Sequence, residues 1–257
     1  MDRRTFLVRT ALVGGAAGLA GCLGEGAGPA GGETDGTATS TGAGRDGGTA
    51  GDGDGATATS TFEDGPPFGD HAATSGVRMQ PYLGPEPGTA TGTIVAFEDP
   101  SCPRCATFER QTVPKIRSEL VEPGDATFVF RGYPVVYAWG KPATRALEAT
   151  FARDEAAHWA LLDYYFRNQD DFRLSETDVL AETESFLETQ TDVDGATVVA
   201  DVEAGTYDDR VQADLDAGDA AGAGGITPTV FLFRDGEYRT KARGSVSFSL
   251  VRTALGL

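Results

Sequence analysis

The stretch EDPSCPRCATFER, residues 98–110, holds two cysteines three positions apart, Cys102 and Cys105. The preceding run GTIVAFED at 92–99 is apolar and rich in β-branched residues, which predicts a buried strand that ends just before Cys102. After Cys102, apolar residues recur every three to five positions, as in an amphipathic helix: Cys105, Phe108, Val113, Ile116 and Leu120. The two cysteines therefore lie where a strand passes into a helix, which Pro114 is expected to kink.

Three roles are open to this cysteine pair: a structural staple, part of a metal site, or a pair that exchanges electrons. The chain has one further cysteine, Cys22, in its N-terminal segment. A disulfide between Cys102 and Cys105 would close a loop of four residues and would stabilise the fold little. A zinc site needs about four ligands, whereas His71 lies in a predicted tether and His158 on an apolar helix face. We therefore expect exchange chemistry, with no metal and no cofactor.

The position of the pair suits thiol chemistry. Cys102 precedes the first turn of the predicted helix, where unpaired backbone N–H groups and the positive end of the helix dipole stabilise a thiolate. It is expected to be the exposed nucleophile. Pro103 fits the first turn, and Arg104 adds positive charge that is expected to lower the pKa of Cys102 further. Cys105, one turn on, faces the packed side of the helix and suits a protected resolving thiol.

Strand and helix patterns alternate through the rest of this region. A second strand is predicted at 126–135, and a helical segment at 142–168 has an apolar face that carries Leu147, Phe151, His158, Leu162 and Tyr165. Shorter helical patterns follow at 179–187, 196–202 and 207–217. Strands return at 227–233 and 237–243, before a final short helix at 250–255. This order predicts an α/β domain with helices inserted between its two halves.

The N-terminal segment, residues 1–22, has the pattern of an export signal. Arg3 and Arg4 precede a weakly apolar run that ends in LAGC at 19–22, and this run is too short and glycine-rich for a spanning helix. RRTFL resembles a twin-arginine signal and LAGC resembles a lipobox, so Cys22 is expected to be lipidated. The alternative is a chance arginine pair before an uncleaved anchor. On either reading the rest of the chain would act outside the cytoplasm.

The segment that follows, residues 23–75, has almost nothing to bury. It consists largely of Gly, Thr, Ala and Asp, and such a composition cannot offset the entropy lost on ordering. We therefore predict a disordered tether at 23–75 and a folded domain at 76–257.

The charge of the chain is strongly acidic. With 21 Lys plus Arg against 39 Asp plus Glu, the formal net charge is -18, which disfavours nucleic acid and anionic membrane surfaces as partners. Contact with the membrane is therefore expected through the lipid anchor only. Only Lys115, Lys141 and Lys241 are lysines, and this Asp-rich, Lys-poor composition resembles that of proteins from extreme halophiles, of haloarchaeal type. Molar salt would screen the self-repulsion of such a chain.

Several motifs together resemble the thioredoxin superfamily, and more closely its DsbA-like branch. Besides CPRC at 102–105, they are Asp99, Phe108, Pro114, FRGYP at 130–134, HW at 158–159 and GITPTVFLF at 225–233. The resemblance spans about residues 93–255. It implies an α/β thioredoxin-like fold with an inserted helical domain at about 140–220.

The resemblance also implies roles for individual residues. Cys102 matches the nucleophile and Cys105 the resolving cysteine of a redox-active disulfide, with Pro103 and Arg104 between them as residues that tune its potential. Thr227 and Pro228 match the cis-proline pair, beside which an extended substrate can bind as an added strand.

The function implied is that of an extracytoplasmic thiol-disulfide oxidoreductase that donates disulfides to secreted or cell-surface protein thiols. The resemblance alone implies a membrane thiol oxidase as the partner that re-oxidises the pair. Two alternatives stay open. One is a thiol reductant or isomerase; the other is a non-enzymatic tethered interaction or metal-binding module whose CxxC holds a soft metal such as Cu(I).

One position departs from the family pattern. Ala96, six residues before Cys102, stands where many members carry a buried acid that relays protons. Glu98 and Asp99 lie nearer the helix and could take its place, but we expect them to be solvated charges at the strand end. The proton relay is therefore left unassigned at this point.

Overall fold

The computed structural model describes residues 67–172 and 175–257, which belong to the unit Ala56–Leu257. The predicted signal segment, Cys22 and the predicted tether up to residue 66 lie outside the described residues. Among the helices that are described, none combines the length and the apolar character needed to cross a membrane.

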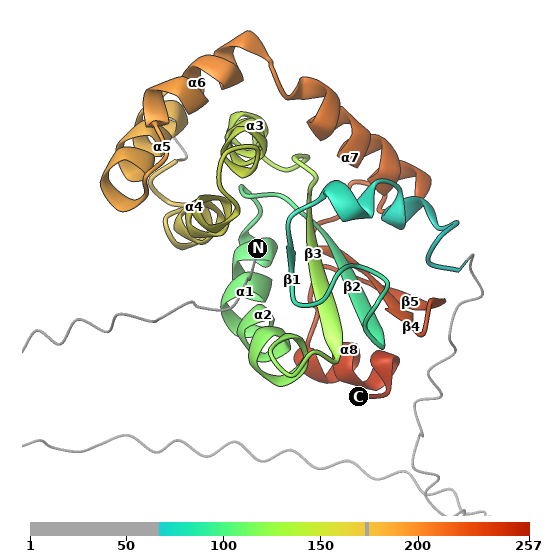
Figure 1. Cartoon of the computed structure of the whole chain (residues 1–257). Coiled ribbons are helices and arrows are strands. Elements are labelled where there is room, and N and C mark those ends of the chain that lie inside the picture. Colours follow the sequence, from blue (N-terminus) through green and yellow to red (C-terminus); the bar gives the residue numbers. More distant parts are fainter. Residues whose placement is uncertain (1–66, 173–174) are drawn as a thin grey trace, which may run out of the picture. The chain divides into compact units, whose positions relative to one another are not determined.

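A five-stranded sheet forms the centre of the described domain (Figure 1). The strands are β1 (Tyr82–Leu83), β2 (Gly92–Glu98), β3 (Ala126–Gly132), β4 (Thr229–Arg234) and β5 (Glu237–Arg243), in the order β1-β3-β2-β4-β5. β2 and β3 are parallel, and every other pair is antiparallel. β2 and β3 are buried along their whole length, as expected for central strands covered on both faces.

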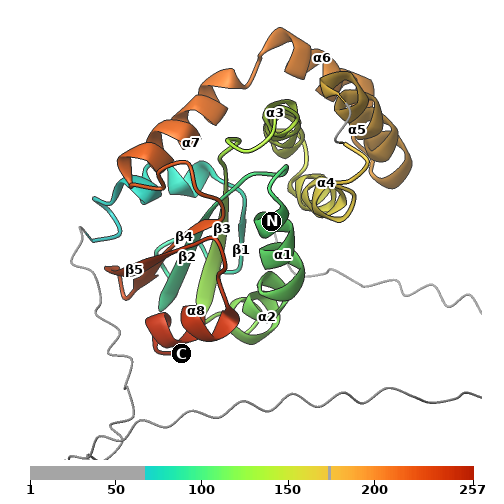
Figure 2. The same cartoon turned by 180° about the vertical axis from the view of Figure 1, so that it is seen from behind.

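Helices cover both faces of this sheet (Figures 1 and 2). Ile94 and Ala96 of β2 face α1 (Pro103–Gln111), α2 (Val113–Ile116) and α8 (Phe248–Leu255). Val95 and Phe97 face the opposite layer, made of α7 (Asp208–Ala220) and the short 3-10 helices η1 (Ala72–Thr74) and η2 (Val77–Met79). Side chains alternate between faces along a strand, so Glu98 continues the row of Ala96 toward α1.

The first helix after the cysteines is interrupted. α1 ends at Gln111, Thr112 follows, and α2 leads into η3 (Arg117–Val121), a π-helical turn. Pro114 lies in the first turn of α2 and has no N–H to continue the ladder of α1. The predicted kink is therefore a break, which falls two residues before the proline.

Between β3 and β4, the residues that the structure describes form five helices. They are α3 (Gly140–Phe151), α4 (Glu155–Arg167), α5 (Glu176–Gln190), α6 (Gly195–Ala204) and α7. The single helical segment expected at 142–168 is wrong, because the chain breaks at Asp154. The Asp154 carboxylate accepts a hydrogen bond of 2.6 Å from the Ala157 N–H and so starts a new helix.

The inserted helices α3 to α6 have a core of their own, which reaches the cysteines. It contains Trp139, Leu161, Tyr165, Phe166, Phe172 and Leu187, and it also contacts Cys102, Cys105 and Ala106 at the start of α1. The helical layer therefore lies over the carboxyl end of β2, where the strand turns into the helix (Figure 1).

A buried ion pair connects α7 to the sheet. The Arg131 guanidinium on β3 donates to the Asp214 carboxylate at 2.6 Å, and both side chains are buried. Arg131 also donates to the backbone carbonyls of Ala73 and Ser75 at 2.9 and 2.8 Å. One arginine thus holds together β3, α7 and the segment before β1.

That N-terminal segment corrects one expectation. His71 was assigned to the tether, but it is buried and stacks on Tyr238, with ring centroids 4.8 Å apart. Phe68, Ala73 and Val77 join the same apolar cluster on the α7 face of the sheet. Ordered packing in the described region therefore begins before the predicted start at residue 76, because a few apolar side chains find a place on that face.

Candidate active site

The cysteine pair lies at the start of α1. Cys102 is the residue that caps the helix, with an extended backbone (φ -81°, ψ 120°), and its carbonyl accepts a hydrogen bond of 3.1 Å from the Ala106 N–H. Pro103 occupies the first turn, where its missing N–H costs nothing. Cys105 lies within this turn, and both cysteines are free thiols.

The expectation that Cys102 is exposed is wrong, since only 1% of its surface is accessible. The backbone carbonyl of Thr227 lies 3.4 Å from its Sγ. Behind it, the Gln169 amide donates to the carbonyls of Pro100 and Cys102 at 2.7 and 3.0 Å. The loop before β4 and the segment after α4 therefore cover the strand-to-helix turn, which no local pattern in the sequence could indicate.

The Thr227–Pro228 pair lies directly against the cysteines. Its peptide bond is cis, and both residues are buried. The sheet causes this proximity, because β4 pairs with β2 and so brings the loop that precedes β4 to the same end of the sheet as Cys102. Of the residues predicted for the site, the structure thus brings together Cys102, Cys105, Thr227 and Pro228.

The two thiols have opposite electrostatic surroundings. The pKa of Cys102 is lowered to about 5. The largest cause is a hydrogen bond from the Cys105 thiol; the Thr227 side chain and the backbone N–H groups of Cys105 and Arg104 act in the same direction, and burial opposes them. Burial raises the pKa of Cys105 well above its usual value, and the neighbouring Cys102 and the charge of Glu98 add to that effect. These opposite pKa shifts favour the thiolate form of Cys102 and the protonated thiol form of Cys105.

The contribution of Arg104 differs from the one expected. Its side chain is exposed and lies beside Gly244, whereas its backbone N–H donates to the Cys102 sulfur. Backbone groups and the second thiol, rather than the guanidinium charge, lower the pKa of Cys102.

The expectation that Glu98 and Asp99 are solvated is also wrong, because both are fully buried. Asp99 accepts four hydrogen bonds. Its Oδ1 accepts from the Ser101 N–H and hydroxyl at 2.7 and 2.6 Å, and its Oδ2 accepts from the N–H groups of Val135 and Val136 at 2.8 and 2.7 Å. Asp99 therefore fixes the loop after β3 against the residues that lead into Cys102.

Glu98 faces the other way, toward α1, where its carboxyl group meets that of Glu109. Glu109, Gln169 and Ser101 are not among the residues predicted for the site from the sequence. Their roles depend on contacts between distant segments, and only Ser101 lies next to the CPRC motif. In the part of the chain that the structure describes, no group of three or more His, Cys, Asp and Glu side chains could hold a metal ion.

The fold and the site define a thioredoxin-like protein with an inserted helical domain. The sequence matches the family described as Thioredoxin over residues 79–245, and the chain therefore belongs to this family.

Individual proteins point to the DsbA branch of the fold. The structure resembles oxidised BdbD from Bacillus subtilis, with a TM-score of 0.61 and 21% identity, over 70% of this chain and 92% of that one. It also resembles DsbA from Chlamydia trachomatis, with a TM-score of 0.56 and 16% identity, over 69% and 88% of the two chains.

A curated relative, probable disulfide bond formation protein D of Bacillus cereus, is 26% identical over 76 residues. This match covers 30% of the present chain and 35% of that protein, so the chain spans about a third of the relative's length.

Proposed function

We propose that this protein is an extracytoplasmic thiol-disulfide oxidoreductase that donates disulfides to the thiols of secreted or cell-surface proteins. One observation carries the proposal. Cys102, with a pKa of about 5, lies beside a buried Cys105 whose pKa is raised, and the backbone of Thr227 lies next to its sulfur. This is the asymmetry that a nucleophile and a resolving thiol require.

The exchange proceeds through a mixed disulfide. In the oxidised protein, a substrate thiolate attacks the Cys102 sulfur, the Cys102–Cys105 bond breaks, and Cys105 leaves as a thiolate that takes up a proton. A second substrate thiolate then attacks the substrate sulfur of the mixed disulfide and releases Cys102 as a thiolate. Two electrons pass from the substrate dithiol to the protein, and another disulfide, such as that of a membrane thiol oxidase, must restore the pair.

The low pKa of Cys102 favours the oxidising direction. A stabilised thiolate stabilises the reduced pair, and this makes the disulfide form a stronger oxidant. We expect a reduction potential above about -200 mV, the range of disulfide donors, whereas a value near -270 mV would favour a thiol reductant or isomerase.

Trapping tests the proposal directly. In the Cys105→Ser variant no second protein thiol can attack the Cys102 sulfur of a mixed disulfide. This route of release is closed, so covalent adducts with secreted proteins should accumulate on Cys102. The matched Cys102→Ser variant keeps a buried thiol and should form none. The measurement is non-reducing electrophoresis with mass spectrometry of the adducts, together with the potential of the wild-type pair in defined glutathione buffers. Equal adduct formation by the two variants would contradict the assigned roles.

The proposed location rests on the sequence of residues 1–22. RRTFL and LAGC support export through the twin-arginine route and lipid attachment at Cys22, and the acidic composition supports a halophilic source. The Cys22→Ser variant should leave the membrane fraction or persist as an unprocessed precursor, as measured by fractionation and intact mass. A processed variant that still sediments with membranes would refute lipid anchoring.

A further inference from the structure

The segments that meet around the cysteine pair lack acidic residues, although the chain as a whole is strongly acidic. The chain has 39 Asp plus Glu against 21 Lys plus Arg. The run 220–234, which contains the loop before β4, holds no Asp or Glu, and neither does the run 238–257, which contains most of β5 and all of α8. The first turn of α1 has none either. These segments therefore bring no carboxylate of their own to the surface around Cys102.

Arg104 places a cation on one side of the loop before β4. Its side chain is exposed, and its Nη1 atom lies 3.5 Å from the position that a Cβ would take at Gly244. The Gly244 N–H donates to the Pro228 carbonyl at 2.8 Å, so Arg104 lies beside the cis-proline loop. Arg104 also lines a cavity of about 350 Å³ between α1 and the residues after β5. The other polar side chains in the walls of this cavity are hydroxyls and an amide: Thr107, Gln111, Thr112, Ser245 and Ser247.

Lys241 and Arg243 place two more cations on the other side of the same loop. Residues two apart on a strand share a face, and Lys241 lies opposite Phe231, which faces α7. The Arg243 guanidinium donates to the Gly222 carbonyl, and the Lys241 Nζ atom lies 3.4 Å from the position that a Cβ would take at Gly222. Arg243 pairs with Thr229, the residue after the cis-proline, and so lies at the same end of the sheet as the cysteines.

We call Arg104, Lys241 and Arg243 the basic cluster. Among the residues that the structure describes, none of its members forms an ion pair with an acid; the cations that do are Arg78, Arg131, Arg145, Arg153, Arg167, Arg210 and Arg234. Asp219, the acid that precedes the loop in sequence, accepts a hydrogen bond from the Tyr133 hydroxyl. In a chain with a formal net charge of -18, the basic cluster thus creates a local positive field beside the reactive sulfur.

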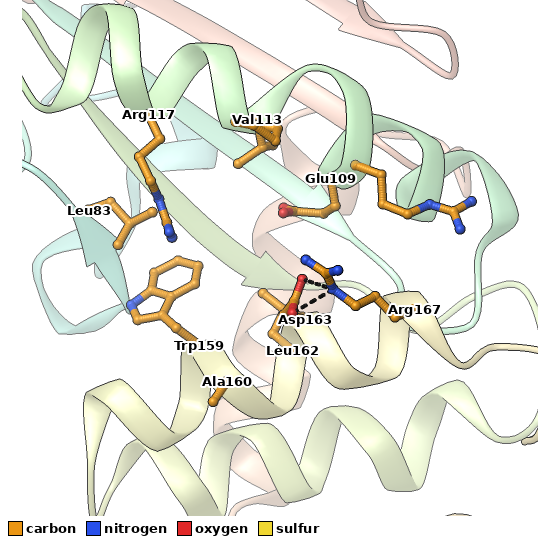
Figure 3. Close-up of a pocket in the computed structure, with 11 residues that line it drawn as sticks. Leu83, Glu109, Val113, Arg117, Trp159, Ala160, Leu162, Asp163 and Arg167 are labelled. Atoms are coloured by element: carbon orange, nitrogen blue, oxygen red, sulfur yellow. Dashed lines mark hydrogen bonds and ion pairs between the residues drawn. The ribbon is translucent and has the colours of Figure 1, made fainter. Parts of the chain in front are cut away.

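The arginines around a second cavity provide a contrast. This cavity of about 620 Å³ lies between the α1–α2 segment and α4 (Figure 3). Figure 3 shows Arg167 in its wall against Asp163, with which it pairs at 2.7 Å, and Arg117 lowers the pKa of Glu109. Acids of the same cavity therefore offset Arg117 and Arg167, whereas no acid of the described residues pairs with the basic cluster. The basic cluster, rather than this larger cavity, is the surface that attracts an external anion.

We propose that the basic cluster selects substrates whose cysteines lie in acidic segments of the chain. The inference rests on the proposed exchange function. A substrate thiolate that attacks Cys102 must bring its neighbouring residues across the loop before β4, where carboxylates beside the cysteine meet Arg104 on one side and Lys241 and Arg243 on the other. Charge complementarity of this kind speeds association and disfavours partners of the wrong sign. Because the cluster flanks a reactive sulfur, its place suits a peptide carboxylate better than an anionic lipid.

The test compares two dithiol peptides that differ only in charge. Both contain two cysteines at the same spacing, flanked by Asp in one peptide and by Asn in the other. Each reduced peptide is mixed with the oxidised protein, quenched in acid at intervals, and analysed by mass spectrometry for the peptide disulfide. Each rate constant is divided by that of the same peptide with bis(2-hydroxyethyl) disulfide, a neutral oxidant, because this corrects for the different thiol pKa values of the two peptides.

On this corrected scale, wild type should oxidise the Asp peptide about fivefold faster than the Asn peptide, at the lowest salt at which it stays folded. The preference should shrink as salt is added, because exposed charges are screened. Arg104→Gln and Lys241→Gln should each lower it to about twofold, and the double variant should abolish it. Arg104→Lys should keep it. A change in the reactivity of Cys102 itself cancels, since each variant is compared with itself on the two peptides.

Lys115→Gln, which removes an exposed cation of α2 beyond the break after α1, is the matched control and should keep the full preference. Equal corrected rates in wild type would overturn the inference and leave the exchange function intact, also where the basic cluster proves to bind vesicles of anionic phosphatidylglycerol. A preference that survives in the double variant would overturn it too. If the double variant does not fold, Arg104→Gln alone decides by the same ratio. A wild-type protein that oxidises neither peptide would refute the proposed function instead.

Discussion

Glu98 and Asp99 are neighbours in sequence and are both fully buried, yet their surroundings differ completely. Asp99 turns away from α1 and accepts hydrogen bonds from Ser101, Val135 and Val136, all between 2.6 and 2.8 Å. Glu98 points toward α1, where it meets the carboxyl group of Glu109, and no N–H or O–H group of another described residue donates to its oxygens. A one-residue step at the end of β2 thus separates a carboxylate that accepts four hydrogen bonds from one that faces a second carboxyl group.

The difference indicates what each buried acid can do. Four donors hold Asp99 as an acceptor and join two loops, so a change there should damage the structure. Glu98 makes no such connections, and burial and the neighbouring Glu109 raise its pKa well above its usual value. Burial by itself therefore does not reveal whether a carboxyl group is structural or functional; the number of donors that face it does.

The largest effect is expected from Asp99→Asn. Each Asp99 oxygen accepts two hydrogen bonds, so an amide NH₂ group at either position would face two donors and leave them unpaired. The free energy of unfolding should fall by about 3 kcal/mol. Glu98→Gln, the matched substitution one residue earlier, should lower it by less than about 1 kcal/mol. Urea or guanidinium denaturation measures both, and equal losses would remove the distinction.

A smaller effect is expected in the pH dependence of stability. An acid whose pKa is raised by folding stabilises the folded state below its unfolded pKa, and this contribution is lost as pH rises through the folded pKa. For Glu109 this window runs from about 4.5 to about 7.

Across this window wild type should lose of the order of 1–2 kcal/mol relative to Glu109→Gln. Denaturation series at several pH values, with Glu119→Gln as the control, measure the difference. Parallel curves for wild type and Glu109→Gln would show that folding does not raise the pKa of Glu109, and the contrast with Asp99 would then fail.

Local patterns in the sequence predicted most of the framework. The apolar run at 92–99 became β2, and the strands predicted at 227–233 and 237–243 became β4 and β5, because short runs between turn residues that are rich in β-branched and aromatic residues are typical of strands. The α/β fold with inserted helices is confirmed. The prediction of one continuous helix at 142–168 was wrong at Asp154. Both α3 and α4 are amphipathic, and the apolar spacing continues across the capping residue, so the spacing does not reveal the break.

The sequence alone determined the motif of the site: two cysteines one helical turn apart, the first at a helix start, and a Thr-Pro pair far along the chain. These features depend on spacing and on backbone geometry. Tertiary structure decided what surrounds them. Pairing of β4 with β2 brought Thr227 to Cys102, and packing of α1 on the sheet brought Glu109 to Glu98. Burial and donor count set the state of each acid, and both depend on contacts between segments that no local pattern contains.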